Sequence, residues 1–582
     1  MRVKKPGITS EPTNISINFE GLQVSARTGE SVAAALVNSG HLGFRTTNAG
    51  AERGIFCGMG VCSECALTID GEPGRLGCMT KVSEGMCVEK NPPMRHLNDA
   101  TSLALEDEVI DCQVLVVGAG PAGLQAALSA AQCGAQVVVL DERVAPGGQY
   151  FKQPNAHFQV EEDGLDHQYR QGRELLHSLD NAGVEIRLGT RVWGASDTGE
   201  IHATSSERRL VLKWRSLVLA SGAYERGVPF PGWTLPGVMT TGAAQTLLRS
   251  YLVAAGRKIL VSGNGPLNLQ VAAELTRADI DVVAVAELAA LWRPSNITHL
   301  TRMMLAAPAY GREGLSYVTD LLRARVPLMA RSTIIEAQGD GRVEAAVVAK
   351  IDETGHAISG TEKSFDVDSI CLGFGFVPSS ELARSLGCSH HLDASSGTVV
   401  VRRDPLGRTS VKGVWVIGDG GSVKGAQVAQ SMGKLAGADA ARHIGATVDS
   451  RGSDETARTI RILSRQEKFQ RSLWQQFKAP RLVDQLATPG TIICRCEEIT
   501  LAEIDAALES WLGSAGSLKR VTRAGMGKCQ GRYCSPVLSE LASRAAGVKV
   551  DAHSGFIPQA PFLPTCAAAL ARGRSLSQDP PS

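Results

Sequence analysis

The sequence predicts an α/β protein in which two doubly wound units follow each other, with a small cysteine-rich unit at each end. Three observations support this fold class. Between residues 108 and 446, apolar strand patterns alternate with helical patterns, which is typical of parallel sheets covered by helices. Glycine-rich turns follow two of these strands, at Gly118 and Gly263. Eight of the 14 cysteines form two groups, one before and one after this central region.

The composition indicates a globular protein of several domains. A chain of 582 residues suggests about four domains. The 60 Lys and Arg nearly balance the 59 Asp and Glu, so the basic excess of a nucleic-acid-binding protein is absent. No apolar run approaches the roughly 18 residues of a membrane-spanning helix, and no apolar segment follows the basic N-terminus as in a secretory signal. A cytoplasmic protein is expected.

Residues 1–100 are expected to form a small unit that holds an iron–sulfur cluster. A predicted hairpin, over residues 15–24, and a short helix after Ser31 precede a cysteine group. Three of its cysteines have the spacing C-x4-C-x2-C of a [2Fe–2S] ferredoxin loop, and a fourth follows after twelve residues. The expected ligands are Cys57, Cys62, Cys65 and Cys78. Zinc and plain thiols remain alternatives, and Cys87 is a substitute for Cys78.

The segment 108–235 begins with a dinucleotide-binding pattern. A strand ends in a G-x-G-x-x-G turn that opens a helix, and a second strand ends in two acids. In such a turn one glycine makes the bend, one admits the pyrophosphate to the helix N-terminus, and one packs helix on strand. An acid at the end of the second strand binds ribose. The expected residues are Gly118, Gly120, Pro121, Ala122, Gly123, Asp141 and Glu142, with Glu142 favoured over Asp141 for the ribose.

Three later segments favour FAD over NAD at this first site. Gly148 and Gln149 would run along the flavin, Ser221 and Gly222 end a strand beside the dinucleotide, and Gly418 and Asp419 would meet its ribityl or phosphate region. Because the last pair lies far along the chain, the FAD domain is expected to be split, over 108–235 and 346–446. No cysteine occurs between residues 134 and 370, which argues against thiol–disulfide chemistry.

A second, NAD-like nucleotide-binding domain is expected between the two halves, over 236–345. Its turn keeps Gly263 and Gly265 but has Asn268 at the third glycine position, and Glu287 ends the following strand. Asparagine there is expected to loosen the helix–strand contact or to reshape the pocket. Binding of NAD(P)H, binding of another nucleotide and a purely structural role therefore stay open for this domain.

A helical linker, over 447–487, is expected to lead to a second cluster domain, over 488–550, and a Pro/Ala-rich tail, over 551–582. The cysteines of this domain have the spacing C-x-C, 32 residues, C-x4-C, and each pair precedes a predicted helix. Helix N-termini would stabilise a negatively charged cluster. The expected ligands of a second [2Fe–2S] cluster are Cys494, Cys496, Cys529 and Cys534, with zinc as the alternative.

Three segments carry a resemblance to a known family: RGIFCGMGVCSECALTIDG, LASGAYERGVPFPGWTLPGVMTTGAAQTLL and GMGKCQGRYCSP. They resemble the α subunits of heteromeric FAD/[2Fe–2S] amine and amino-acid dehydrogenases, such as octopine and nopaline oxidases, hydrogen cyanide synthase, proline and hydroxyproline dehydrogenases and, in the central part, sarcosine oxidase. The resemblance implies a two-dinucleotide-binding-domain flavoprotein with a fused N-terminal ferredoxin-like β-grasp domain. It also implies a C-terminal domain similar to bacterioferritin-associated ferredoxin.

The same resemblance implies that this chain transfers electrons and does not itself oxidise the substrate. A separate β subunit, similar to glycine oxidase and D-amino-acid dehydrogenase, would oxidise a C–N bond of an amino acid, opine or secondary amine. Electrons would then reach a downstream acceptor through FAD and two [2Fe–2S] clusters. An FMN at the subunit interface is known in parts of this group, and a hetero-oligomer is implied. Any association with the inner membrane would be peripheral, through the partner or acceptor.

The residues themselves support the electron-transfer interpretation. The sequence shows no acid/base constellation that could face a substrate, so no catalytic residue is predicted. A flavin and two clusters in one chain suit the conversion of hydride pairs into single electrons. The alternative is a self-contained NAD(P)H-dependent iron–sulfur flavoprotein reductase, which the second glycine turn favours and Asn268 disfavours. A third interpretation, a scaffold protein whose cofactor sites are vestigial, is disfavoured because all eight cysteines of the two groups are present.

Overall fold

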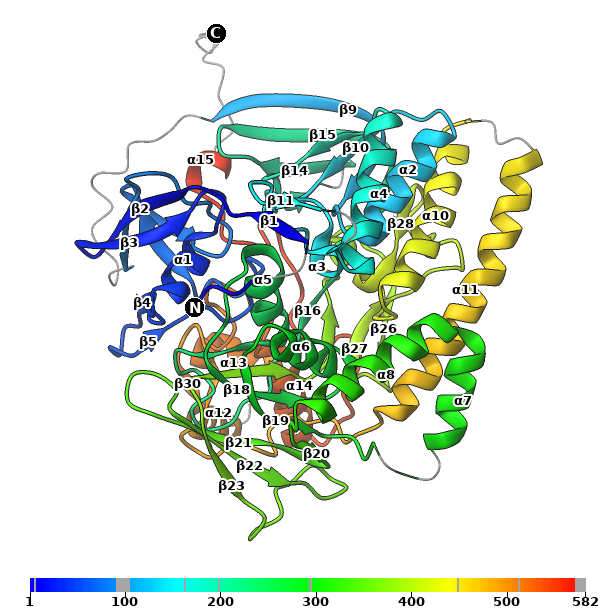
Figure 1. Ribbon diagram of the computed structural model, residues 1–582. Helices are drawn as coiled ribbons and strands as arrows, with labels where there is room; N and C mark the ends of the chain where they lie inside the picture. Colours follow the sequence, from blue (N-terminus) through cyan, green and yellow to red (C-terminus); the bar gives the residue numbers. More distant parts are fainter. Residues whose placement is uncertain are drawn as a thin grey trace, which may run out of the picture.

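The computed structural model (Figure 1) describes residues 1–4, 7–90, 105–161, 164–196, 199–291, 293, 296–446, 450–510 and 513–570. The connection between the first two units falls largely on residues 91–104, which lie outside the described residues. The end of the predicted tail, over 571–582, lies outside them as well.

The N-terminal unit is a five-stranded mixed sheet with one helix. Its strand order is β3 (Leu22–Arg27), β2 (Asn14–Phe19), β8 (Cys87–Lys90), β6 (Ala66–Ile69) and β7 (Glu72–Leu76). The hairpin of β2 and β3 forms because Glu20 and Gly21 adopt positive φ, as a two-residue turn requires. Helix α1 (Val32–Asn38) begins after Ser31, whose hydroxyl accepts from the backbone N–H of Ala34. The cysteine loop joins the small pair β4 (Arg45–Thr46) and β5 (Glu52–Arg53) to β6.

The first doubly wound unit is built on a seven-stranded sheet. Its order is β12 (Glu185–Arg187), β10 (Val137–Leu140), β9 (Glu106–Val117), β15 (Arg208–Leu219), β14 (Glu200–Thr204) and β13 (Arg191–Ala195), and β28 (Val414–Val416) pairs in parallel with β15. Helix α2 (Pro121–Gln132) follows the glycine turn and packs against α10 (Ala426–His443). The unit is therefore split in sequence, because β28 and α10 return to it after the second unit.

The second doubly wound unit has a five-stranded parallel sheet. Its order is β17 (Val238–Thr240), β24 (Ser369–Gly373), β18 (Lys258–Gly263), β19 (Asp281–Glu287) and β20 (Leu328–Ala330). Helices α5 (Thr241–Tyr251) and α6 (Pro266–Arg277) follow β17 and β18. A three-stranded antiparallel sheet is formed by β21 (Ser332–Gln338), β22 (Ala345–Lys350) and β23 (Lys363–Asp366). Strand β24 lies beyond residue 345, in the segment expected to return to the first unit. A fully buried parallel strand has the same apolar pattern in either sheet, so the sequence did not place it.

Three helices cover the side of the molecule where the two doubly wound units meet: α7 (Asn296–Ala306), α8 (Pro308–Arg323) and α11 (Ser450–Gln476). Helix α11, drawn in gold in Figure 1, packs against α7 and α10, so it contacts helices of both units. The segment expected to be a linker is therefore an integral wall of the central region.

Short elements complete the central units. They are β1 (Ile8–Ser10), α3 (Gly148–Phe151), β11 (Gln159–Val160), α4 (His167–Asn181), β16 (Ala223–Glu225), β25 (Phe376–Pro378), α9 (Glu381–Ser385), β26 (His390–Asp393), β27 (Thr398–Val401) and a 3₁₀ turn η3 (Gly418–Gly420). Strand β1 pairs with β11 and so ties the start of the chain to the first unit.

The C-terminal unit is mainly helical. It comprises β29 (Ile492–Cys494), β30 (Ile499–Thr500), α12 (Leu501–Glu509), α13 (Ala515–Thr522), α14 (Ser535–Ala545) and, after an irregular stretch, α15 (Ala567–Leu570). A capping box between Thr500 and Glu503 starts α12. The irregular stretch packs back on the first unit, where Phe562 is buried and its N–H donates to the carbonyl of Trp193 (3.1 Å).

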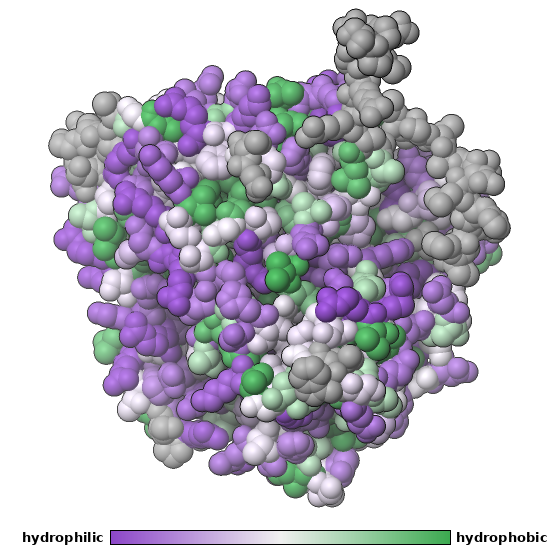
Figure 2. Space-filling view, turned by 180° about the vertical axis from the view of Figure 1, so that it is seen from behind, coloured by the Kyte–Doolittle hydropathy of each residue, from purple (hydrophilic) through white to green (hydrophobic). Residues whose placement is uncertain are grey.

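The surface is mixed in character. On the face shown in Figure 2, hydrophobic side chains form small separate groups among hydrophilic ones. Across the described residues, no helix combines the length and apolar character needed to cross a membrane.

Candidate functional site: one dinucleotide cavity and two cysteine centres

A cavity of about 700 Å³ lies at the first glycine turn and extends toward the second. Gly118 adopts a φ of +108°, and a Cβ there would lie 2.4 Å from the carbonyl oxygen of Ala220. A Cβ on Gly123 would lie 1.8 Å from the carbonyl oxygen of Gly118, so that glycine lets α2 pack on β9. Above Gly120 the space is open, because the nearest atom to a Cβ is 3.9 Å away, in Gly148. The loop thus leaves room for a pyrophosphate at the N-terminus of α2.

The structure separates the roles of the two acids after β10. The carboxylate of Asp141 accepts from the backbone N–H groups of Ala119 (2.6 Å) and Arg143 (2.8 Å), and burial raises its pKa. Asp141 therefore holds the glycine loop in shape. Glu142 lines the cavity, and its carboxylate pairs with Arg191 at 3.4 Å. Of the two, Glu142 is the one with a carboxylate available for a ribose hydroxyl.

The remaining residues predicted for the first site line the same cavity. They are Pro121, Ala122, Gly148, Gln149, Ser221, Gly222, Gly418 and Asp419. Asp419 accepts from the backbone N–H groups of Lys424 (2.8 Å) and Gly425 (3.1 Å), which lead into α10. Burial raises the pKa of Asp419. Residues more than 290 positions apart therefore form one dinucleotide-shaped site, and the donor set fits FAD.

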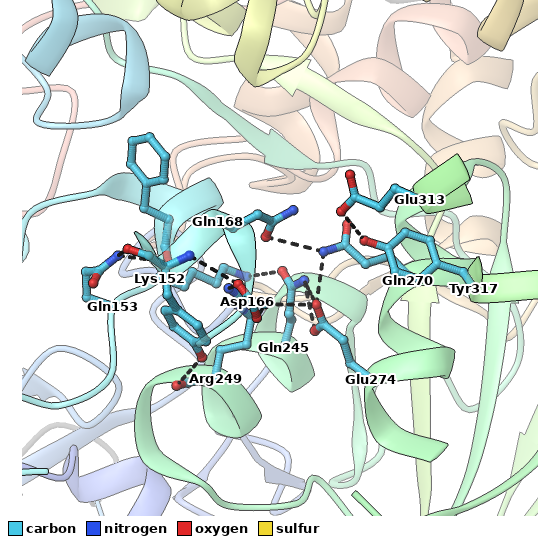
Figure 3. Close-up of polar contacts among 12 residues, drawn as sticks. Lys152, Gln153, Asp166, Gln168, Gln245, Arg249, Gln270, Glu274, Glu313 and Tyr317 are labelled. Carbon is cyan, nitrogen blue, oxygen red and sulfur yellow. Dashed lines mark hydrogen bonds and ion pairs between the residues drawn. The ribbon is translucent and has the colours of Figure 1, made fainter. Parts of the chain in front are cut away.

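A buried lysine that the sequence pattern did not reveal also lines this cavity. Lys152 Nζ donates to the carbonyl of Gly242 (2.9 Å). It also donates to Gln245 Oε1 (2.9 Å), as Figure 3 shows. The Gln245 amide donates to the Glu274 carboxylate (3.2 Å), which also accepts from Arg249 (3.0 Å). No local motif marks Lys152, because its partners lie about 90 residues further along the chain. A cation here would favour a reduced, anionic flavin.

Burial lowers the pKa of Lys152 to about 7. In the unfolded chain a lysine keeps its proton up to about pH 10.4. Between these values the unfolded state binds more protons than the folded state, so the free energy of unfolding should rise with pH, by at most about 1.4 kcal/mol per unit. In Lys152→Met, the part of this rise in the free energy of unfolding that comes from the lysine should be absent. Urea unfolding of both proteins from pH 7 to 10 tests this, and parallel pH profiles would contradict it.

At the second glycine turn, the side chain at the third glycine position is held by protein groups. The Asn268 side chain is buried, accepts from Thr241 Oγ1 (3.0 Å) and donates to the carbonyl of Gly373 (2.9 Å). It thereby ties α6 to α5 and to β24. The expectation that asparagine would loosen this contact was wrong, because its amide supplies two hydrogen bonds where the third glycine would supply only close packing.

The acid that ends the following strand holds this turn, as Asp141 holds the first one. The Glu287 carboxylate is buried and accepts from the N–H groups of Gly265 (3.0 Å) and Ala289 (2.9 Å), and burial raises its pKa to about 8. The Trp474 indole of α11 lies 3.6 Å from the position of a Cβ on Gly265. Gly263 and Gly265 thus form the turn, and Gly265 and Trp474 both line the cavity.

The four N-terminal cysteines lie in one loop and form two pairs. The Cys57 and Cys62 thiols hydrogen-bond to each other, as do those of Cys65 and Cys78. Burial opposes ionisation of Cys57, but hydrogen bonds from the Cys62 thiol and from backbone N–H groups lower its pKa to about 7. Cys78 is buried, whereas Cys87, on β8, is exposed.

The C-terminal cysteines show the same arrangement. The Cys534 thiol lowers the pKa of Cys494 to about 7 by a hydrogen bond, and Cys496 hydrogen-bonds to Cys529. The Gly525 N–H donates to Cys494 Sγ (3.4 Å). Each pair therefore joins one cysteine of the C-x-C segment to one of the C-x4-C segment.

Paired thiols fit a two-iron cluster. Each iron of a [2Fe–2S] cluster takes two cysteine sulfurs, so two pairs per site match two irons. Backbone N–H groups at 3.4–3.5 Å from Cys57, Cys62 and Cys65 sulfurs add the hydrogen bonds that such clusters receive.

Family comparisons match the three parts of the chain separately. The pyridine nucleotide-disulphide oxidoreductase model matches residues 112–433, the 2Fe-2S iron-sulfur cluster binding domain matches residues 12–93, and the BFD-like [2Fe-2S] binding domain matches residues 492–544. The predicted α/β flavoprotein fold with a [2Fe–2S] domain at each end is thereby confirmed, as are FAD and two clusters as its cofactors.

Individual relatives cover most of the chain. Hydrogen cyanide synthase subunit HcnB of Pseudomonas aeruginosa is 30% identical over 436 residues, 74% of this chain and 93% of that protein. An opine oxidase subunit of Rhizobium meliloti (strain 1021) is 31% identical over 467 residues, 77% and 96% respectively. The crystal structure of L-proline dehydrogenase from P. horikoshii shares the fold, with a TM-score of 0.70 at 21% identity over 98% of this chain and 100% of that one.

Proposed function

Because this chain belongs to the pyridine nucleotide-disulphide oxidoreductase family, within the group that includes hydrogen cyanide synthase subunits HcnB and the matching opine oxidase subunits, we propose that it is the electron-transferring subunit of a heteromeric dehydrogenase or oxidase. A partner β subunit, similar to glycine oxidase and D-amino-acid dehydrogenase, oxidises the C–N bond of an amino acid, opine or secondary amine. This chain receives the electrons and passes them to a downstream acceptor.

One observation carries this proposal: two sets of paired cysteines flank a single dinucleotide cavity. When bound, a flavin accepts two electrons together and releases them singly, which suits one-electron clusters. The chain's own residues bind and orient the carriers. The open space at Gly120 and the N-terminus of α2 take the pyrophosphate, Glu142 takes a ribose, and the cysteine loops direct N–H groups at the sulfurs.

Disulfide chemistry does not fit this cavity. No cysteine occurs among its lining residues in the described part of the chain. The remaining cysteines of the central units, Cys112, Cys133, Cys371 and Cys388, are buried or half-buried, and burial raises the pKa of Cys371 well above its usual value. The family name therefore describes the fold of this chain and its flavin site, and we assign no thiol–disulfide step to it.

The second candidate is an NAD(P)H-dependent reductase, which the second glycine turn favours. Against it stands Trp474, whose indole lies against this turn. An anaerobic titration of the isolated chain separates the two functions. We expect no change of the flavin and cluster absorbance with NADH, followed by full bleaching with dithionite.

Rapid bleaching by NADH would overturn the electron-transfer proposal in favour of the reductase. Bleaching by dithionite serves as the control that all carriers are bound and reducible. Once the partner β subunit has been added, its amine substrate should bleach the same bands, and flavin released in excess of one FAD from each subunit would identify an interface FMN.

A further inference from the structure

The two cysteine centres lie against each other, although more than 400 residues separate them in sequence. Cys57 and Cys62 of the N-terminal unit and Cys529 of the C-terminal unit belong to one buried apolar cluster, which also contains Phe56 and Tyr533. The spacing of neither cysteine motif indicates this contact, so only the tertiary structure reveals it.

A buried ion pair bridges the two centres. Glu64 lies between the ligands Cys62 and Cys65, and Arg495 lies between Cys494 and Cys496. The Arg495 Nε donates to the Glu64 carboxylate at 2.9 Å, and the two side chains are only 3% and 1% exposed. The second carboxylate oxygen of Glu64 accepts from Arg45 (2.6 Å).

Further contacts fix the position of Arg495. Its Nη1 donates to the carbonyl of Trp233 (2.6 Å), and its guanidinium lies 4.0 Å from the centre of the Phe56 ring. Such a pair is tolerated in the interior only when its polar groups are satisfied, and it then holds the two units in one arrangement. The Glu64–Arg495 ion pair thereby links the N-terminal cysteine loop to the C-terminal one.

Aromatic rings fill the remaining space between the centres and the cavity. Tyr533, next to the ligand Cys534, has its ring centre 5.2 Å from that of Phe56, which precedes Cys57. The Tyr533 ring is 5.9 Å from that of Tyr224, which lies between two cavity-lining residues. The Tyr533 hydroxyl is buried and has no hydrogen-bond partner within the described ranges. Its ring, and not its hydroxyl, makes the packing contacts.

The N-terminal centre also borders the cavity directly. Met59 lines the cavity, and its N–H donates to Cys57 Sγ (3.5 Å). A Cβ on Gly58 would lie 3.0 Å from Ala243, so this loop packs on the start of α5, near Lys152. Met59 and Lys152 both line the cavity, and we take the part of the cavity that they line as the position of a flavin ring. The C-terminal cysteine loop also reaches the cavity, through Arg532, but its Cys496 is partly exposed, while the other seven cysteines of the two sites are buried.

We propose that the two clusters exchange electrons directly across this junction, formed by Glu64, Arg495, Phe56 and Tyr533, with the N-terminal cluster on the flavin side and the C-terminal cluster on the acceptor side. The inference rests on the proposed function. Each step moves one electron: one carrier is oxidised as the next is reduced, and no bond forms or breaks. When bound and reduced, a flavin would supply two electrons in succession and release its protons to solvent, and an external one-electron oxidant would receive the electrons. The aromatic rings lie between the carriers and are not themselves oxidised.

Single-cluster variants of the full chain test the order of transfer. The flavin is reduced by a light flash with EDTA as the sacrificial electron donor, and the reduction of each cluster is followed by its absorbance. In Cys529→Ser, which lacks the C-terminal cluster, the N-terminal cluster should be reduced as fast as in the wild type. In Cys65→Ser, which lacks the N-terminal cluster, fast reduction of the C-terminal cluster should be lost. Fast reduction of the C-terminal cluster in Cys65→Ser would overturn the proposal.

A second measurement keeps the test decisive if a cysteine variant does not fold. Glu64→Gln removes one negative charge next to both centres at nearly constant volume, so the midpoint potentials of both clusters should rise together. The control Glu72→Gln, at a half-exposed ion pair on β7, should leave both potentials unchanged. A shift of one potential alone, or of neither, would overturn the shared junction. A purified chain that contains neither flavin nor iron would instead refute the proposed function.

Discussion

Serine in place of Cys529 is expected to remove about half of the iron that the chain binds, because one of two clusters is lost. Bound FAD should be unchanged, since Cys529 does not line the dinucleotide cavity. The Cys496 sulfur would lose its partner in the pair, and one iron would be left with a single thiolate. Iron and flavin are measured on the same purified sample. An unchanged iron content would show that Cys529 is not a ligand.

The N-terminal site offers a matched control for the same measurement. Cys78→Ser should also remove about half of the iron, because Cys78 is buried and paired with Cys65. Cys87→Ser should retain all of it, because Cys87 is exposed on β8. The reverse pattern would make Cys87 the fourth ligand, which the spacing alone also permits.

Valine in place of Gly120 is expected to weaken FAD binding by about 100-fold, or roughly 3 kcal/mol, without unfolding the chain. The backbone of Gly120 has φ −82° and ψ −178°, a conformation that valine adopts readily. The nearest atom to the added Cβ is 3.9 Å away, so the Cβ is accommodated, and the side chain extends into the space for the pyrophosphate. Equilibrium titration of the flavin-free protein with FAD measures the effect.

A glycine elsewhere controls for the substitution itself. Gly516 lies in α13, and the nearest atom to a Cβ there, Ser514 Oγ, is 3.8 Å away. Gly516→Val should therefore bind FAD with the affinity of the wild type. Circular dichroism and iron content should be unchanged in Gly120→Val. FAD affinity equal to the wild type in Gly120→Val would show that the pyrophosphate does not lie over this residue.

The sequence was sufficient for features whose chemistry depends on local spacing. A glycine turn works through backbone geometry within about six residues, so Gly118, Gly120 and Gly123 could be recognised without the fold. Likewise, the C-x4-C-x2-C loop places three thiolates on one short segment. The order of these motifs along the chain was enough to predict the split flavin domain and the cluster domain at each end.

Contacts between distant segments were decided only by the tertiary structure. Trp474 contacts the second glycine turn from a helix expected to be a linker, and Asn268 is satisfied by groups from two other elements. Lys152 is held by α5, and Glu64 by Arg495, more than 400 residues away. None of these pairs has a characteristic spacing. Burial and charge pairing depend on which surfaces meet, and that is determined by packing of the whole chain, which a local pattern does not contain.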